Sequence, residues 1–274
     1  MKKIHFYANT TKAAALSARD ELVDFAKSLG LEPCEASLAE AIITLGGDGT
    51  ILRAVRDLPG VPVLGFNLGG LGYLSSVESK DFKIALERFS KGLYKVADRS
   101  LLALLDSDGK ERAIALNDIV IMREMSGHAA VLDLEIDSRL AARYMADGLV
   151  IATPTGSTAY SLSAGGPVVM PGSPSFVVTP MNSHALGIRP MVVSDGVVFR
   201  VTSRPRADGA ADKLGVYVDG ESVFMLDGAQ SIEIVKSSRV FKMIELEGYD
   251  PYDVLARKLG WSGTTIDRSP SQEG

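Results

Sequence analysis

A glycine-rich pentapeptide near the N-terminus carries the residue types that bind phosphate. Gly46–Thr50, with the sequence Gly-Gly-Asp-Gly-Thr, follows the apolar run Ala41–Leu45 and precedes a helical pattern. Glycines lack a Cβ atom, so their N–H groups can approach an anion closely, especially at a helix start. Asp48 repels such an anion unless it accepts a hydroxyl proton or holds a divalent metal. The alternative is a tight turn in which Asp48 caps the next helix.

A second glycine-rich segment, Asn67–Leu74, follows the apolar run Val61–Phe66. Ligands of open parallel sheets bind beyond the carboxyl ends of the strands. If the runs before the two segments form neighbouring strands, both segments line one crevice. A plain connection is the alternative for Asn67–Leu74.

The most informative segment is Asp147–Pro167, where an apolar run leads into a turn rich in hydroxyl groups. Gly156 is placed to open a short helix, and Gly165–Pro167 to end it. Hydroxyls and helix-start amides offer hydrogen bonds to a polar ligand, and the ring of Tyr160 can stack on a base. In the alternative interpretation the hydroxyls cap the helix and Tyr160 is a core residue.

A shorter signal, Asn117-Asp118, ends the run Ala113–Leu116. A neighbouring amide and carboxylate can accept hydrogen bonds from both hydroxyls of a ribose. An ordinary turn is the alternative for this dipeptide.

Taken together, these segments resemble the NAD kinase family. Gly46–Thr50, Asn117-Asp118 and Asp147–Pro167 occur in the order and spacing of that family, and the last is the most specific. The resemblance covers nearly the whole chain. Further similar stretches are Asn67–Leu74, Pro180–Pro190 and Asp219–Glu221.

The resemblance implies an activity and a set of site residues. The chain would phosphorylate the 2′-hydroxyl of the adenosine ribose of NAD, with ATP or another triphosphate or polyphosphate, to make NADP. Asp48 would be the catalytic residue beside that hydroxyl. The residues around the phosphates would be Gly46, Gly47, Gly49, Thr50 and Arg53. The residues that bind NAD would be Asp48, Gly49, Asn117, Asp118, His128, Asp147, Thr158, Ala159, Tyr160, Ser161, Leu162, Ser163 and Glu221.

Within the NAD-binding set, the resemblance gives the residues different parts. Asn117 and Asp118 would hold the ribose hydroxyls, Asp147 would contact the nicotinamide end, and Thr158–Ser163 would line the adenine and ribose pocket. The chain departs from the family at two positions. Some members carry a basic residue where Met145 stands, and Gly70 is smaller than the residue expected in its loop.

The elements that must position these residues alternate in the first part of the chain. Apolar runs with strand character and amphipathic runs with helical spacing predict βαβ units and a Rossmann-like parallel sheet. We expect an α/β domain with the phosphate-binding loop over residues 1–98. Its strands are expected at 4–8, 41–45 and 61–66, and its helices at 11–29, 51–58 and 81–91.

Short strands separated by Asp-Gly turns dominate residues 99–247, which predicts an all-β-rich, NAD-binding domain of stacked sheets. Residues 248–274 are expected to add a tail helix that Asp250 caps, Pro251 begins and Gly260 ends. The resemblance implies that this tail returns to the first domain. The strands of the second domain are expected at 101–105, 113–116, 131–137, 149–152, 176–179, 197–202, 216–218, 232–236 and 240–246.

The composition limits the kinds of partner and compartment that we expect for this chain. The net charge of −5 disfavours nucleic-acid binding, and no window approaches the roughly 20 apolar residues of a membrane span. The single cysteine fits a reducing cytoplasm, so we expect a cytoplasmic protein. The three histidines lie far apart and show no zinc spacing.

A divalent metal is expected as cofactor: Mg²⁺, carried with the nucleotide rather than held by a cluster of protein ligands. ATP and NAD are the expected substrates. The resemblance also implies a homodimer or homotetramer in which neighbouring subunits help to form the site.

Two other functions fit part of this pattern. Lipid kinases and 6-phosphofructokinases share the pentapeptide at Gly46–Thr50, but they need a lipid-sized apolar pocket or an arginine-rich sugar-phosphate site, which Asp147–Pro167 does not supply. A non-catalytic dinucleotide sensor on the same fold is the other alternative. An intact Asp48 argues against a sensor.

Overall fold

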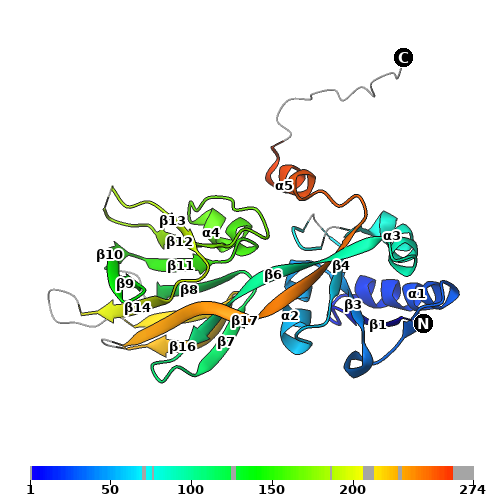
Figure 1. The fold of residues 1–274 in the computed structure, drawn as a ribbon, viewed down its shortest axis with the longest axis horizontal. Coiled ribbons are helices and arrows are strands. Elements are labelled where there is room, and N and C mark those ends of the chain that lie inside the picture. Colours follow the sequence, from blue (N-terminus) through cyan, green and yellow to red (C-terminus); the bar gives the residue numbers. More distant parts are fainter. Residues whose placement is uncertain are drawn as a thin grey trace, which may run out of the picture. The chain divides into compact units, whose positions relative to one another are not determined.

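The computed structural model describes residues 2–69, 72–75, 77–124, 128–185, 187–205, 213–227 and 230–261. The chain divides into two compact units, each with its own hydrophobic core (Figure 1). The first unit comprises Met1–Val96 and Met243–Gly274, and the second comprises Ala97–Lys242. Gly70, whose size departs from the family pattern, lies outside the described residues.

The first unit is an α/β domain built on a parallel sheet. Strand β1 pairs with β2 and β3, and β3 pairs with β4, all in parallel register. The short strand β5 extends β4, and the last residues of β17 pair with β4 through Met243 and Val63. The strands are β1 (Lys3–Ala8), β2 (Glu32–Pro33), β3 (Ala41–Gly46), β4 (Val63–Asn67) and β5 (Val77–Glu78).

Apolar faces of the helices supply the rest of this core. Phe66 of β4 stacks on Phe82 of α3, with ring centroids 4.4 Å apart, and Leu22 and Ala26 of α1 are buried with them. The helices are α1 (Ala13–Ser28), α2 (Asp48–Asp57), α3 (Phe82–Ser90) and α5 (Pro251–Leu259), with 3₁₀ turns at Ala36–Leu38 and Ser79–Asp81. The predicted alternation of strands and helices is confirmed. Helix α2 begins at Asp48, three residues earlier than expected.

The tail helix α5 has the predicted ends. The Asp250 carboxylate accepts a hydrogen bond from the Tyr252 N–H at 2.8 Å, and Pro251 occupies the first turn. Gly260 ends the helix in the left-handed region, with φ of 65°. Val254 and Leu255 are buried, so the apolar face of α5 packs on the first unit.

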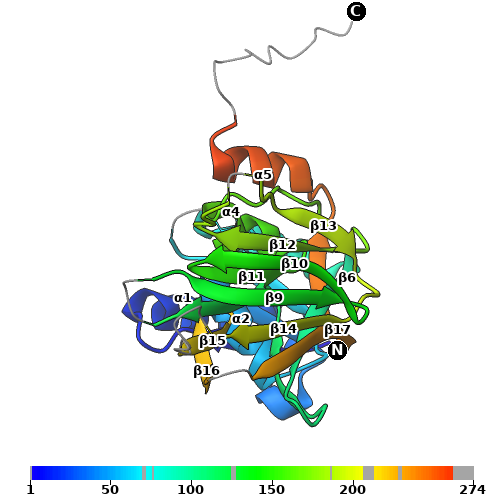
Figure 2. The ribbon, with the colours of Figure 1, turned by 90° about the vertical axis from the view of Figure 1, so that its left-hand side faces the viewer.

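The second unit stacks two antiparallel sheets over one core (Figure 2). One sheet has the order β13-β12-β11-β8-β15-β16, and in the other β10, β9, β14 and β17 follow one another, with β6 and β7 also attached. The β-rich architecture is as predicted. The strands are β6 (Tyr94–Leu105), β7 (Glu111–Ala115), β8 (Asp118–Arg123), β9 (Ala130–Ile136), β10 (Arg139–Ala146), β11 (Gly148–Ala152), β12 (Ser175–Met181), β13 (Met191–Ser194), β14 (Phe199–Arg204), β15 (Leu214–Val218), β16 (Glu221–Leu226) and β17 (Ser231–Leu246).

Three details of this unit differ from the prediction. The strands expected at 232–236 and 240–246 are one continuous strand, β17. Asp118 does not end a strand but begins β8, whereas β7 stops at Ala115. Strands β8, β10, β13 and β16 are absent from the prediction, although β8, β13 and β16 contain the short apolar runs 119–122, 191–193 and 223–226.

No helix in the described part of the chain is long and apolar enough to span a membrane.

Candidate active site

Asp48 stands where strand β3 passes into helix α2, and a loop from the next strand surrounds its carboxylate. Oδ1 accepts hydrogen bonds from the backbone N–H groups of Leu74 and Ser75, at 3.1 and 2.9 Å, and from the Ser75 hydroxyl at 2.8 Å. Oδ2 accepts one from the Tyr73 N–H at 2.8 Å. The two glycine-rich segments therefore meet at this side chain, as expected for loops after neighbouring parallel strands.

Glycines make this contact sterically possible. A Cβ atom on Gly72 would lie 2.1 Å from the Ser75 Oγ and 2.3 Å from Oδ1 of Asp48. On Gly65 of β4, a Cβ atom would lie 2.8 Å from the Leu74 carbonyl oxygen. The loop can thus reach the carboxylate only because both positions lack side chains.

The glycines of the pentapeptide itself divide into two groups. A Cβ atom on Gly46 would lie 2.1 Å from Oγ1 of Thr50, so this glycine makes room for a buried threonine. Gly47 and Gly49 have no atom within 4 Å of the Cβ position, and Arg53 is exposed one turn into α2. These three positions have open space around them, and their contact with phosphates stays a prediction.

In the second unit, Asn117 and Asp118 line a cavity of about 380 Å³. Its other lining residues come from β8, from the start of the short helix α4 (Tyr160–Ser163) and from the hairpin of β15 and β16: Val120, Met122, Ala159, Tyr160, Tyr217, Asp219 and Gly220. The aromatic rings and apolar side chains at this cavity suit the flat face of a base, and the amide and carboxylates suit hydroxyl groups.

Asp219 fixes the backbone of the Asn117-Asp118 pair. Its carboxylate accepts hydrogen bonds from the N–H groups of Leu116, Asn117 and Asp118, at 2.9, 2.7 and 3.2 Å. Asp219 occupies the hairpin turn with φ of 48°, a conformation that aspartate tolerates better than most residues.

The burial of Asp118 changes its acidity. Desolvation raises the pKa of this carboxyl to about 7, and the nearby charge of Asp219 acts in the same direction. A hydrogen bond from the backbone of Tyr160 opposes the rise in pKa. The carboxyl of Asp118 therefore changes its charge near neutral pH.

The hydroxyl-rich segment after β11 holds itself together by internal hydrogen bonds. The buried Thr153 hydroxyl donates to the Leu116 carbonyl at 2.6 Å and accepts from the Gly156 N–H at 3.0 Å. Ser157 donates to the Pro154 carbonyl at 2.7 Å. Ser161 forms a hydroxyl pair with Thr179 at 2.9 Å. The hydroxyls of Ser157 and Ser161 are thus engaged in internal hydrogen bonds, although neither of them caps the short helix that follows Gly156.

The rest of this segment is arranged differently. Tyr160, on the short helix α4 (Tyr160–Ser163), is 41% exposed and lines the cavity together with Ala159. The Thr158 hydroxyl donates to the Thr155 carbonyl at 3.2 Å. Leu162 is half-buried and Ser163 is exposed. Tyr160 is therefore available for stacking rather than sequestered in the core.

Asp147 lies in a small polar network just before β11. Its Oδ1 pairs with Arg123 at 2.6 Å, and its Oδ2 accepts a hydrogen bond from the Asn182 amide at 2.9 Å. Arg123 also donates to the backbone carbonyl of the exposed His128 at 3.0 Å. Met145 is exposed on β10.

Both halves of the chain match models of known protein domains. Residues 1–94 match the model of the ATP-NAD kinase N-terminal domain, and residues 116–246 match that of the ATP-NAD kinase C-terminal domain. The chain is 34% identical over 286 residues to an NAD kinase of Syntrophotalea carbinolica, covering 95% of this chain and 99% of that protein. The chain belongs to the NAD kinase family.

Other members of the NAD kinase family show the same likeness. An NAD kinase of Symbiobacterium thermophilum is 40% identical over 230 residues, which cover 82% of this chain and 79% of that protein. Yeast NADH kinase, solved in complex with NADH, superimposes with a TM-score of 0.81 at 26% identity, over 97% of this chain and 89% of that chain.

A second solved member of the NAD kinase family, from Archaeoglobus fulgidus and in complex with ATP, has a TM-score of 0.79 at 25% identity. This match covers 95% of this chain and 99% of the archaeal chain. These neighbours support nucleotide substrates and agree with the predicted two-part fold.

A resident metal site is not visible in the described residues, where no three His, Cys, Asp or Glu side chains could hold an ion together. The described neighbours of Asp48 are the loop amides and the Ser75 hydroxyl, which donate to its carboxylate, and the ammonium of Lys258. A divalent ion would need further oxygen ligands here, which the phosphates of a nucleotide can supply.

Sequence reasoning missed three charged residues near the predicted site residues. Arg123 pairs with Asp147, and Asp219 orders the Asn117-Asp118 backbone. Lys258 of α5 places its ammonium 3.7 Å from Oδ2 of Asp48. Asp219 lies in an Asp-Gly turn and in the similar stretch Asp219–Glu221, but neither Arg123 nor Lys258 lies in a recognisable motif. Glu221, in contrast, was predicted, and it is exposed at the start of β16.

Proposed function

We propose that this chain transfers the γ-phosphoryl group of ATP to the 2′-hydroxyl of the adenosine ribose of NAD, with Asp48 as general base. The difference between the two carboxylate oxygens carries this proposal. Oδ1 accepts three hydrogen bonds from the loop, whereas Oδ2 accepts one. A carboxylate oxygen has about two lone-pair sites, so Oδ2 retains acceptor capacity for a ribose hydroxyl.

The remaining acceptor site on Oδ2 determines the chemistry that we propose. As the 2′-oxygen attacks the γ-phosphorus, its proton passes to Oδ2 of Asp48, the bond from phosphorus to the bridging oxygen breaks, and ADP leaves. The three donors on Oδ1 hold the carboxylate in one orientation before the reaction. Such positioning carries much of the rate enhancement in phosphoryl transfer.

The dinucleotide is held by the residues of the second unit. Asn117 and Asp118 accept the ribose hydroxyls, and Tyr160 stacks on the adenine from the wall of the same cavity. Asp147 contacts the nicotinamide end. His128, Glu221 and the segment Thr158–Ser163 complete the NAD-binding set.

The triphosphate is held by the start of helix α2. The Cβ positions of Gly47 and Gly49 are open, and the amides of these glycines bind the phosphates at the helix N-terminus, with Arg53 nearby. Gly46 and Thr50 shape this turn. A divalent ion, Mg²⁺, would accompany the nucleotide and neutralise charge on its phosphates.

Two further properties complete the proposal. The enzyme works as a homodimer or homotetramer, which is what the family resemblance implies. It acts in the cytoplasm, where its single cysteine, Cys34, stays reduced.

One coupled assay tests the activity. Purified chain is incubated with ATP, Mg²⁺ and NAD, and NADP is detected with an NADP-dependent dehydrogenase. Steady NADP formation supports the proposal. Binding of NAD without NADP formation would instead favour the non-catalytic sensor. Parallel reactions with other triphosphates, polyphosphate and NADH define the preferred donor and acceptor.

A further inference from the structure

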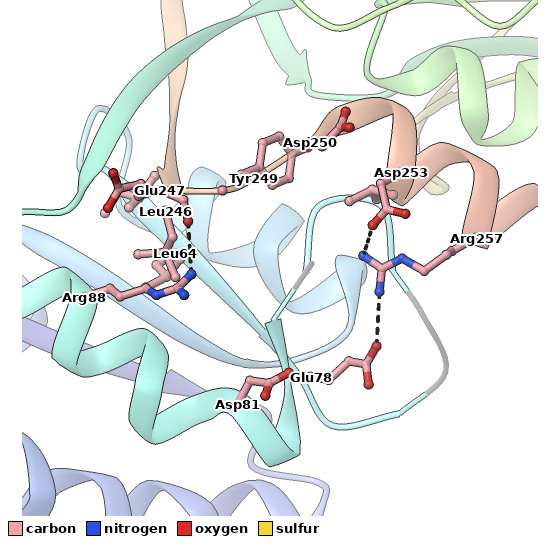
Figure 3. A pocket seen from close by; sticks show the side chains of 13 residues that line it. Leu64, Glu78, Asp81, Arg88, Leu246, Glu247, Tyr249, Asp250, Asp253 and Arg257 are labelled. Carbon is pink, nitrogen blue, oxygen red and sulfur yellow. Dashed lines mark hydrogen bonds and ion pairs between the residues drawn. The ribbon is translucent and has the colours of Figure 1, made fainter. Parts of the chain in front are cut away.

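The tail helix α5 is firmly attached to the first unit by contacts other than Lys258. Arg257 bridges Asp253 on its own helix, at 3.1 Å, and Glu78 of β5, at 3.3 Å (Figure 3). Val254 and Leu255 bury the apolar face of the helix. Helix α5 thus has contacts with the first unit besides those of Lys258.

Lys258 points from this helix to the catalytic carboxylate. Its ammonium lies 3.7 Å from Oδ2 of Asp48 and 5.3 Å from the centroid of the Tyr73 ring. The side chain is only 24% exposed. In the described part of the chain, Asp48 is the acid within ion-pair distance of this ammonium.

The oxygen that Lys258 faces is the reactive one. Oδ1 is occupied by three donors of the loop, and Oδ2 is the oxygen assigned above to receive the ribose proton. The 2′-oxygen bonded to that proton is the atom that joins phosphorus. An ammonium beside Oδ2 is therefore close to the place where the phosphoryl oxygens arrive.

The geometry points to Lys258 as a catalytic cation that contacts the transferring phosphoryl group, an inference that rests on the proposed function of Asp48. The ion pair at 3.7 Å is longer than a good hydrogen bond, so the ammonium N–H groups are not committed to the carboxylate. When Asp48 takes up the proton it becomes neutral, and the charge of Lys258 then acts on the phosphoryl oxygens. In a partly dehydrated site this attraction is stronger than in water.

The roles of α5 and Lys258 can be separated by two substitutions on the same helix. Lys258→Met keeps the length and apolar stem of the side chain but removes the charge. Arg257→Met removes a neighbouring charge that contacts Glu78 and Asp253 and does not approach Asp48. NADP formation, the binding of NAD at equilibrium and thermal unfolding are measured for both variants, for Lys258→Arg and for Lys258→Ala, the last with and without methylammonium.

We expect Lys258→Met to lower kcat by about 10²-fold, in the range seen when one donor to a developing negative charge is lost. Its Kd for NAD and its melting temperature should stay close to those of the wild type. Lys258→Arg should recover part of kcat, and methylammonium added to Lys258→Ala should raise its kcat. Arg257→Met should retain most of the activity.

Several outcomes would overturn the inference. If Lys258→Met kept the wild-type kcat, the ammonium of Lys258 would have no part in catalysis. If Arg257→Met and Lys258→Met instead lost kcat equally and melted at lower temperatures, with no rescue of Lys258→Ala by methylammonium, Lys258 would only help to attach the helix to the first unit. Failure of the proposed function looks different, because the wild-type chain would then make no NADP at all.

Discussion

A Cβ atom on Gly72 would stand 2.3 Å from Oδ1 of Asp48, which is closer than any real non-bonded contact. Asp48 begins helix α2 and Gly72 lies in the loop after β4, so the absence of a side chain at Gly72 leaves room for the Asp48 carboxylate. Because Ser75 Oγ would also be only 2.1 Å away, an added methyl group must displace the two side chains that share a hydrogen bond there.

We therefore expect Gly72→Ala to displace the Tyr73–Ser75 amides from Asp48 and to lower kcat by tenfold or more, since small misplacements of catalytic groups can cost about 10²-fold. Steady-state NADP formation measures the effect. Gly196→Ala is the matched control, because its added Cβ atom meets its nearest neighbour at 3.7 Å. Equal activity of Gly72→Ala and wild type would mean that the loop contact does not hold Asp48 for catalysis.

Replacing the proposed base gives a second prediction. Asp48→Asn should lower kcat by roughly 10²–10⁴-fold, which corresponds to a barrier higher by about 3–5 kcal/mol. NAD binding at the Asn117-Asp118 cavity should persist, because this cavity is built within the second unit. Calorimetric titration with NAD, run beside the kinetic assay, separates the two effects. Near-normal turnover of the variant would exclude Asp48 as the base.

The sequence predicts those parts of the fold whose signals are local. The buried run Ala41–Leu45, and the residues Asp250, Pro251 and Gly260 at the ends of the tail helix, each specify their structure within a few positions. Strand β17 was divided in two because Lys236–Arg239, in its middle, is polar and resembles a turn. In the structure the backbone there stays extended, and Ser237 is buried.

In the candidate site, too, residue types can be predicted from local sequence motifs, whereas contacts between distant residues cannot. The type and place of Asp48 can be read from its pentapeptide, but its hydrogen-bond donors lie 25 to 27 residues away. The contacts of Asp219 with Asn117 and of Lys258 with Asp48 join residues still further apart. No local pattern encodes such pairs, because they depend on how the sheets bring loops together.

The buried carboxyl of Asp118 predicts a pH dependence of stability. Its pKa is raised from 3.8 to about 7 by burial and then by Asp219, so between these values the folded chain holds a proton that the unfolded chain releases. The free energy of unfolding should therefore fall as the pH rises from about 4 to about 7 and level off above, with a slope of at most about 1.4 kcal/mol per pH unit.

Urea unfolding of the wild type and of Asp118→Asn over this pH range isolates that contribution. The variant lacks the titrating group, so its stability relative to the wild type should increase with pH up to about 7. Curves that run parallel from pH 4 to pH 8 would contradict a raised pKa at Asp118.

The buried hydroxyl of Thr153 gives the last prediction. It donates to the Leu116 carbonyl and accepts from the Gly156 N–H, and thereby ties the hydroxyl-rich turn to the residue before Asn117. Thr153→Val keeps the shape but leaves both backbone groups without this partner, at a cost of about 1–3 kcal/mol of unfolding free energy. A Cβ on Gly156 would lie only 2.0 Å from the Asn117 carbonyl oxygen, so the two segments are closely packed and loosening one should disturb the other. We expect KM for NAD to rise in Thr153→Val and to stay near the wild-type value in Thr153→Ser, which retains the hydroxyl. If both variants bind NAD equally well, the turn does not position the ribose-binding pair.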